Sequence, residues 1–331
     1  MALHAELLED IDALERLGGP WDALALARGR PYCTPGWMLA WLREVAPADA
    51  LIRACAVHDG GELVGLAPFW TTREGGRYGL LAERTSSPVE PLAAGGREQE
   101  VATAVAAILA GAEPRPRELE LIGHPGGSGW PLLLAEAWSW SVERTRVEAL
   151  PAVSLDAEDA EAWLASRSRN LRQQLRRGRR QLDSAGARLR VSAGAERERD
   201  LAAFARLHHA RWRRWGGSRA LDPAVEAMLR TAGSALGDER FRLLTLEVDG
   251  EAISSHLFVR GGGVLAYWLG GFDERWAACK PSLQVLASAV QDGIEHGDRV
   301  LELGPGGQDY KYRLADGGGE LEWLTLRPAG V

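Results

Sequence analysis

The sequence has few cysteines and no long apolar run. Its three cysteines, Cys33, Cys55 and Cys279, are odd in number and far apart, so the sequence indicates neither a disulfide framework nor a Cys-rich zinc site. No apolar run approaches the roughly 20 residues that cross a bilayer. The first residues, MALHAELLEDIDALERLGG, hold acids where a secretory signal has a basic flank and an apolar block. We therefore expect a cytoplasmic protein without a membrane span.

Positive charge is scarce overall but concentrated in one segment. The chain carries a formal net charge of −7, yet residues 166–190 contain nine arginines against one acid, Asp183. This segment is therefore +8, and the rest of the chain is −15, the difference between −7 and +8. Such an asymmetry first suggests a nucleic-acid contact. The acidic remainder argues against a DNA-binding protein, because no extensive basic surface is left outside 166–190 and 211–214.

Length and pattern predict two domains. At 331 residues the chain is long for one hydrophobic core. Apolar periodicity and turn residues predict helices over 7–17, 34–45, 98–109, 156–182, 196–215, 223–235 and 281–295. Strands are expected on both sides of Asp59-Gly60-Gly61, over 77–81, 119–123 and 150–155, in a meander from 241 to 271, and over 298–302. The pattern restarts near residue 150, so we predict domains over 1–150 and 151–331.

An internal repeat supports a duplication. AVHDGGELVGLAPFW (56–70) and LEVDGEAISSHLFV (246–259) share an apolar strand, an Asp-Gly turn, Gly-Glu and a second apolar strand. Gly61-Glu62 aligns with Gly250-Glu251, and Phe69 aligns with Phe258. Each copy continues into a glycine-rich turn, a strand, a helix and a short strand. The shared order favours two related α/β units over chance similarity.

These features resemble a known group of enzymes. The matching segments occur in the same order over most of the chain: TPGWMLAWL (34–42), DGGELVGLAPF (59–69), SRNLRQQLRRGRRQL (168–182), VDGEAISSHLFV (248–259), KPSLQVLASAVQDGIEHG (280–297) and LELGPGGQDYKYRL (301–314). Together with the final Gly-x-x-x-Tyr-Lys they resemble the Fem-type branch of the GNAT acyltransferase superfamily, and more closely its cellulose-biosynthesis-type (CelD-like) acetyltransferases.

The resemblance implies a fold and a reaction. It implies an α/β (α+β) chain of two tandem GNAT-like domains, each a mixed, mostly antiparallel sheet flanked by helices, with the active site in the second. It also implies transfer of an acyl or aminoacyl group from acyl-CoA or aminoacyl-tRNA to an amine, with no permanently bound cofactor. One departure stands out. The loop before the 281–295 helix reads ERWAACKPSL and lacks the Gln/Arg-x-x-Gly-x-Gly/Ala pattern that usually cradles the CoA pyrophosphate.

The terminal motif supplies three candidate catalytic residues. The resemblance points to Lys311, which follows a glycine-rich loop and could stabilise a developing oxyanion. Its alternative is a surface lysine. Tyr310 is a candidate proton donor or a packed aromatic residue. Asp309 is a candidate for positioning the amine or for capping the turn.

The predicted central strands supply two candidate bases. His256 lies in the strand ISSHLFV, and an imidazole with a near-neutral pKa suits deprotonation of an amine. The alternative is a hydrogen-bonded core histidine. Glu302 ends the neighbouring strand, and a carboxylate could accept the same proton through water. Trp268 could line the cleft or pack in the core. His208-His209 cannot share a helix face, so we expect no metal site.

Two basic features could bind phosphate. Lys280 and Ser282 flank the start of a predicted helix, where N–H groups and the helix dipole favour anions. The basic helix has Leu171, Leu175, Gly178 and Leu182 on one face and arginines on the other, and four of these, Arg169, Arg172, Arg176 and Arg177, are candidate substrate contacts. They could grip tRNA, contact a CoA or substrate phosphate, or pair with acids such as Glu196, Glu198 and Asp200.

Three functions remain open from the sequence. The first is an N-acyltransferase acting on a small-molecule or precursor amine, with acyl-CoA or tRNA as donor. The second is a non-catalytic GNAT-like module that binds a nucleotide or saccharide precursor, which the missing phosphate loop motivates. The third is an RNA-binding protein that uses the basic helix of 166–190.

Overall fold

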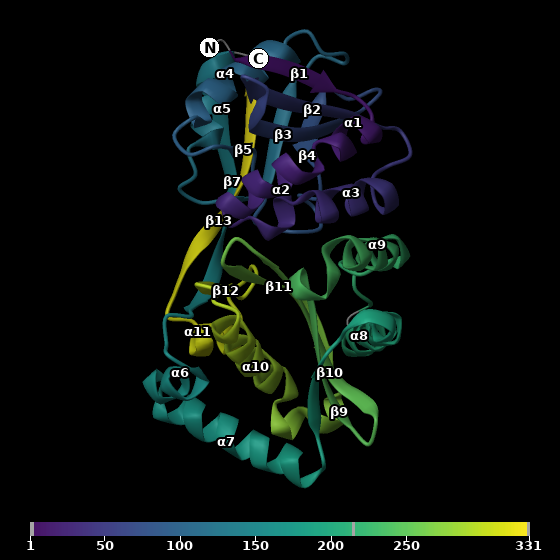
Figure 1. Cartoon of the computed structure of the whole chain (residues 1–331), viewed down its shortest axis with the longest axis vertical. Coiled ribbons are helices and arrows are strands. Elements are labelled where there is room, and N and C mark those ends of the chain that lie inside the picture. Colours follow the sequence, from purple (N-terminus) through teal and green to yellow (C-terminus); the bar gives the residue numbers. More distant parts are fainter. Residues whose placement is uncertain (1–2, 214–215, 330–331) are drawn as a thin grey trace. The chain divides into compact units, whose positions relative to one another are not determined.

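The computed structural model describes residues 3–213 and 216–329, and the chain divides into two compact units (Figure 1). The first unit contains residues 1–149 and 319–331, and the second contains residues 150–318. The boundaries fall inside two long strands, β7 (Trp140–Ser154) and β13 (Gly317–Pro328). The predicted domain limits of 1–150 and 151–331 stay a prediction, because compactness alone does not show where an independently folding domain ends.

The first unit contains a mixed sheet with the strand order β1-β2-β3-β4-β6-β13. Its elements, besides β13 and the first part of β7, are β1 (His4–Leu8), α1 (Ile11–Arg16), α2 (Gly18–Ala27), η1 (Pro31–Cys33), α3 (Pro35–Glu44), β2 (Ala50–Asp59), β3 (Glu62–Thr72), β4 (Arg77–Leu80), β5 (Leu92–Ala93), α4 (Glu98–Leu109), β6 (Glu118–Pro125) and α5 (Trp130–Trp138). Strands β4 and β6 pair in parallel, and the other neighbouring pairs are antiparallel. Helix α4 packs on β1, β2 and β3.

The second unit repeats this arrangement, with the strand order β7-β12-β11-β10-β9-β8. After the end of β7 its elements are α6 (Ala160–Ser166), α7 (Arg169–Ser184), β8 (Arg188–Val191), η2 (Gly194–Glu196), α8 (Arg197–Trp212), α9 (Pro223–Arg240), β9 (Phe241–Val248), β10 (Glu251–Gly261), β11 (Val264–Phe272), η4 (Glu274–Cys279), α10 (Pro281–Glu295), β12 (Val300–Glu302) and α11 (Asp309–Leu314). Figure 1 shows α8 and α9 on one face of the sheet and α10 on the other. Strands β11 and β12 pair in parallel, and the remaining neighbours are antiparallel.

The two sheets share the repeat that the sequence indicates. The β2–β3 hairpin turns at Asp59–Glu62 and the β9–β10 hairpin turns at Val248–Glu251. Phe69 and Phe258, which the repeat aligns, are both fully buried. Each hairpin is followed by a strand, a helix and a strand that pairs in parallel with the one before the helix. The expected mixed, mostly antiparallel α/β fold is confirmed.

Three predicted helices differ from the structure. The expected helix over 7–17 is replaced by β1, whose pairing with β2 sets Leu7 opposite Cys55, and α1 starts only after Asp10 accepts a hydrogen bond from the Ala13 N–H. The expected helix over 156–182 is two helices. Ser168 has extended backbone and caps α7 through the Leu171 N–H at 3.3 Å. Helix α8 ends at Trp212, and the predicted end at Trp215 lies outside the described residues.

Local sequence explains the ends of the helices that form the second unit. Asp159 and Asp222 accept hydrogen bonds from the third backbone N–H of α6 and α9, at 2.7 and 2.9 Å. Lys280 precedes α10 in the left-handed conformation, with φ 52°, and Pro281 begins the helix. Among the described residues no helix is long and apolar enough to pass through a bilayer.

Candidate active site and an arginine-lined pocket

In the second unit the parallel pairing of β11 and β12 stops after three residue pairs, and we call the end of this pairing the opening. Their parallel register runs from Val264 opposite Val300 to Ala266 opposite Glu302. Strand β12 then ends, while β11 continues to Phe272. The chain after β12 passes Gly304, where an added Cβ atom would lie 3.1 Å from the Tyr267 carbonyl oxygen. Glu302, a predicted base, therefore lies at the edge of the opening and is partly buried.

His256 lies on β10 directly opposite Gly270 of β11. Its side chain is 3% exposed, and neither ring nitrogen has a hydrogen-bond partner within the described residues. Burial, with a smaller effect of the Arg211 charge, lowers the pKa of His256 to about 3. The near-neutral pKa that made this residue a candidate base is therefore a wrong expectation, because burial disfavours the charged imidazole. The ring is neutral and hydrogen-bond competent at pH 7.

Two tyrosines adjoin His256. The Tyr267 ring centroid is 5.4 Å from that of His256. Tyr310, at the start of α11, shares a hydrogen bond with Tyr267, and burial raises the pKa of the Tyr310 hydroxyl. Tyr310 therefore keeps its proton at neutral pH and can act as a donor. Strands β10 and β11 and helix α11 thus bring together two predicted residues and one, Tyr267, that sequence reasoning missed.

Arg211 of α8 is a further residue that the sequence did not single out as part of the site. Its guanidinium lies 4.5 Å from the centroid of the Phe272 ring and 2.9 Å from a Glu274 carboxylate oxygen. Its charge contributes to the lowered pKa of His256 and partly opposes the rise that burial causes in the pKa of Tyr310. No motif around Arg211 in the sequence indicates this placement, because it depends on how α8 packs on β11.

Lys311 is buried rather than exposed on a loop. Its side chain belongs to α11, is 4% exposed, and donates hydrogen bonds to the carbonyl oxygens of Gly304 at 3.0 Å and Pro305 at 2.6 Å. The surface-lysine alternative is therefore wrong. The ammonium group fixes the loop that follows β12. Asp309 is exposed in the first turn of α11.

The remaining predicted residues surround the sheet and the start of α10. Trp268 is partly buried, and its ring lies 6.3 Å from that of Phe204 on α8. Lys280 is exposed and donates to the Gln174 side-chain oxygen of α7 at 3.3 Å, and Ser282 is partly buried. The loop before α10 contains a short 3-10 helix (η4) and no glycine-rich cradle.

The arginines of α7 have different partners. Arg172 donates to the Ala165 carbonyl at 2.9 Å and also to that of Arg167, so it holds the α6–α7 connection. Arg169 and Arg177 are exposed. The predicted pairing with acids applies to Arg190, whose guanidinium lies 2.7 Å from Asp200 and also binds Glu196 and Glu247. Within α7 it applies to Arg179, which pairs with Asp183 four residues later at 2.8 Å.

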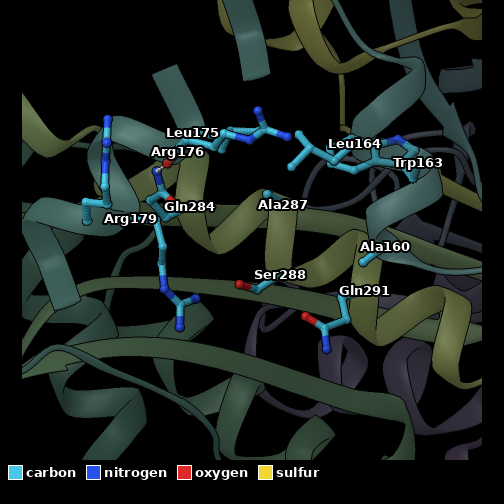
Figure 2. A pocket seen from close by; sticks show the side chains of 11 residues that line it. Ala160, Trp163, Leu164, Leu175, Arg176, Arg179, Gln284, Ala287, Ser288 and Gln291 are labelled. Carbon is cyan, nitrogen blue, oxygen red and sulfur yellow. Dashed lines mark hydrogen bonds between the residues drawn. The ribbon is translucent and has the colours of Figure 1, made fainter. Parts of the chain in front are cut away.

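A separate pocket of about 460 Å³ lies between α6, α7 and α10 (Figure 2). Figure 2 shows Trp163 and Leu164 of α6 at one end and Arg176 and Arg179 of α7 toward the other. Residues of α10, among them Ala287 and Ser288, lie between them. None of the lining residues belongs to the opening beside β12. The pocket therefore uses Arg176, a predicted phosphate contact, away from the candidate catalytic residues.

Comparison with known proteins identifies a domain in the second unit. Residues 169–312 match the family model described as an acetyltransferase (GNAT) domain. The resemblance of the sequence to the GNAT acyltransferase superfamily is thus confirmed, and residues 169–312 of the second unit form a GNAT domain. A search of curated proteins finds no match.

Solved structures show the same fold over nearly the whole chain. The tandem GNAT protein of the clavulanic acid biosynthesis pathway superposes with a TM-score of 0.51 at 15% identity, covering 100% of both chains. FemX superposes with a TM-score of 0.61 at 12% identity, covering 88% of this chain and 90% of its own. The C-terminal domain (DUF2156) of an Agrobacterium fabrum protein described as a lysylphosphatidylglycerol synthetase also gives 0.61 at 12% identity, covering 96% and 92%. At these identities the likeness concerns the fold alone.

Proposed function

We propose that this protein is an N-acyltransferase whose reaction takes place in the opening between β11 and β12. The proposal rests on the neutral, unpaired imidazole of His256 beside Tyr267 and Tyr310 at the point where the two parallel strands of a GNAT domain separate. Buried polar side chains normally have hydrogen-bond partners, so the unpaired ring nitrogens of His256 are suited to bind a polar group of a substrate.

The residues suit distinct steps of acyl transfer. The amine attacks the carbonyl carbon of the acyl donor and loses a proton, which Glu302 can accept directly or through water. The tetrahedral intermediate collapses, the bond to the leaving group breaks, and Tyr310 can return a proton to the departing thiolate or ribose oxygen. His256, being neutral, can accept or donate a hydrogen bond to the bound amine. Lys311 positions the loop after β12 by holding the Gly304 and Pro305 carbonyls.

The donor and the acceptor are the finer part of the proposal. Lys280 and Ser282 at the start of α10 could meet the phosphates of acyl-CoA, and Asp309 and Trp268 could meet the amine. The basic face of α7, with Arg169 and Arg177 exposed, could instead meet the backbone of an aminoacyl-tRNA. Both donors belong to a cytoplasmic enzyme that acts on a small-molecule or precursor amine.

Assays with purified protein separate these donors. Acyl-CoA is offered with a panel of amines and free thiol is measured, and aminoacyl-tRNA is offered with the same panel and deacylation is measured. Activity that ribonuclease abolishes identifies a tRNA donor, and ribonuclease-resistant thiol release identifies CoA. Tyr310→Phe should lower kcat with little change in KM if Tyr310 donates the proton. No turnover with either donor would contradict the proposal.

A non-catalytic binding module is the second candidate function. The loop of residues 273–280 lacks the glycine-rich pattern that usually holds the CoA pyrophosphate, which favours this alternative. Nucleotide or nucleotide-sugar binding without turnover would support it. Turnover that Tyr310→Phe abolishes in a folded protein would count against it.

A further inference from the structure

We propose that the pocket between α6, α7 and α10 binds a single amphiphilic phosphate, a molecule with a hydrocarbon chain and a phosphate group at one end. This inference does not depend on the proposed acyl transfer, because the pocket shares no lining residue with the opening beside β12. The sequence predicts that the basic helix contacts a phosphate. The pocket adds that this phosphate is carried on a hydrocarbon chain.

Part of the pocket lining is apolar. Trp163, which is 3% exposed, lies with Leu164 at one end, Ala287 lies between the ends, and Leu175, which is 5% exposed, lies beside Arg176 (Figure 2). A volume of about 460 Å³ lies within the range of small-molecule sites. Because apolar side chains line it, transfer of a hydrocarbon chain from water into this space is favourable.

The other end of the pocket is strongly basic. Arg176, Arg179 and Arg180 line it, and all three are exposed. Across the described part of the chain, the guanidinium groups of Arg176 and Arg180 form no hydrogen bond or ion pair, whereas Arg179 pairs with Asp183 at 2.8 Å. Guanidinium groups bind phosphate oxygens through paired, charge-assisted hydrogen bonds. Two unpaired arginines next to an apolar space therefore complement a phosphate carried on a hydrocarbon chain.

A buried donor provides a second, independent observation. The Trp163 Nε1–H is buried and has no acceptor among the described residues. The Trp163 ring is instead contacted by the Arg167 guanidinium at 5.7 Å from its centroid. Buried N–H groups normally have an acceptor. A bound molecule with an oxygen along its length would supply the missing acceptor.

The pocket is held in shape by direct contacts between α7 and α10. Gln284 donates to the Leu175 carbonyl oxygen at 3.0 Å. At Gly178 an added Cβ atom would lie 2.5 Å from the Cys279 carbonyl oxygen and 2.6 Å from Gln284 Nε2, so this close approach requires glycine. The two helices are therefore fixed in register before a ligand arrives, which reduces the entropic cost of binding.

The test uses three probes on the full chain by isothermal titration calorimetry. Octyl phosphate below its micelle concentration has both parts, inorganic phosphate has only the head, and octyl glucoside has only the chain. We expect octyl phosphate to bind at least about tenfold more tightly than either partial probe. Equal binding of inorganic phosphate and octyl phosphate would overturn the proposal, because the apolar part of the pocket would then contribute nothing.

Two double variants with the same charge change locate the site. Arg176→Gln/Arg180→Gln removes the two unpaired guanidinium groups of the pocket and should weaken octyl phosphate binding by about tenfold or more. Arg169→Gln/Arg177→Gln changes exposed arginines of the same helix that do not line the pocket, and should weaken binding less than about twofold. Equal weakening by both would overturn the proposal in favour of diffuse charge attraction.

Macromolecular ligands give a different pattern. If α7 binds RNA, both double variants should weaken binding of a bulk RNA probe alike and octyl phosphate should not compete, which would overturn the proposal. Binding to anionic vesicles without binding of monomeric octyl phosphate would likewise overturn it. Filling the apolar part of the pocket with Ala287→Phe should abolish octyl phosphate binding, while circular dichroism reports whether the variant folds.

Discussion

The imidazole of His256 lies against Gly270 of the neighbouring strand, in space that a Cβ atom at residue 270 would occupy. A Cβ atom at Gly271, the next residue, would overlap the backbone of His208 in α8. Gly270 therefore accommodates the His256 ring of β10, and Gly271 accommodates helix α8. The position of the imidazole thus depends on the missing side chain at Gly270, and the approach of α8 depends on the one at Gly271.

The first prediction tests this relationship. Gly270→Ala should destabilise the fold by about 1–3 kcal/mol, because the new methyl group overlaps the His256 ring. His256→Ala removes the ring, so the double variant should lose less stability than the sum of the two single variants. Gly271→Ala is the control, since its methyl group meets the His208 backbone and its cost should add to that of His256→Ala. Denaturant unfolding measures the three single variants and both double variants with His256→Ala, and additivity for Gly270→Ala would contradict the packing described.

The second prediction concerns pH and His256. Its pKa is about 3 in the folded chain against an ordinary value of 6.5, so below pH 6.5 the unfolded state binds a proton that the folded state does not. The stability contribution of the neutral ring is complete above pH 6.5 and is lost as pH falls toward 3, at up to ~1.4 kcal/mol per pH unit. His256→Phe should flatten the fall in unfolding free energy between pH 6.5 and 5. The exposed His4→Gln should leave the slope unchanged.

The same shift predicts a feature of the pH–rate profile. A neutral His256 cannot produce a break in kcat/KM near pH 6.5 for the free enzyme. A break there that His256→Gln removes, with the variant still active, would show that the imidazole titrates in the ordinary range and would contradict its burial.

The third prediction has the opposite sign and concerns the first unit. Burial raises the pKa of the Glu83 carboxyl to about 8 from its ordinary value of 4.5. The folded state therefore holds a proton that the unfolded state releases, and stability is lost as pH rises from 4.5 through 8. Glu83→Gln, whose amide oxygen can still accept from the Ile122 N–H, should be more stable than wild type by an amount that grows between pH 5 and 8. Glu62→Gln, an exposed site, should show the wild-type pH dependence.

The fourth prediction concerns Lys311. Lys311→Met removes the donors to the Gly304 and Pro305 carbonyls and should cost about 1–3 kcal/mol of unfolding free energy. Acyl transfer should fall with it, since the loop after β12 loses its support. Lys280→Met removes an exposed lysine and should change stability by less than about 0.5 kcal/mol. Wild-type stability in Lys311→Met would show that the ammonium group does not hold the loop.

Much of the fold could be predicted because its signals are local. The bounds of α4 and α10 agree with the expected ranges of 98–109 and 281–295, since both have apolar periodicity and clear ends. The hairpin at residue 59 follows from an Asp-Gly turn between apolar runs. The buried face of α7, with Leu171, Leu175, Gly178 and Leu182, also follows from spacing alone.

The elements and site residues that the sequence did not predict correctly have non-local causes. Residues 4–8 are apolar enough to extend a helix, but pairing with β2 makes them a strand. Strand β13 pairs with β6, some 200 residues earlier in the chain, and no local pattern indicates that partner. Tyr267 and Arg211 join the candidate site only because α8 packs on β11 and α11 folds beside it.

Residue type and spacing alone indicated the resemblance to GNAT acyltransferases, the repeated order of elements, the basic face of one helix and most of the candidate residues. Only the tertiary structure decided the burial, the protonation and the hydrogen-bond partners of those residues. Burial makes His256 neutral and turns Lys311 from a loop lysine into the support of a loop. Packing of α7 on α10 turns some of the arginines into the wall of a pocket. Desolvation and proximity are properties of the folded chain, and no local pattern contains them.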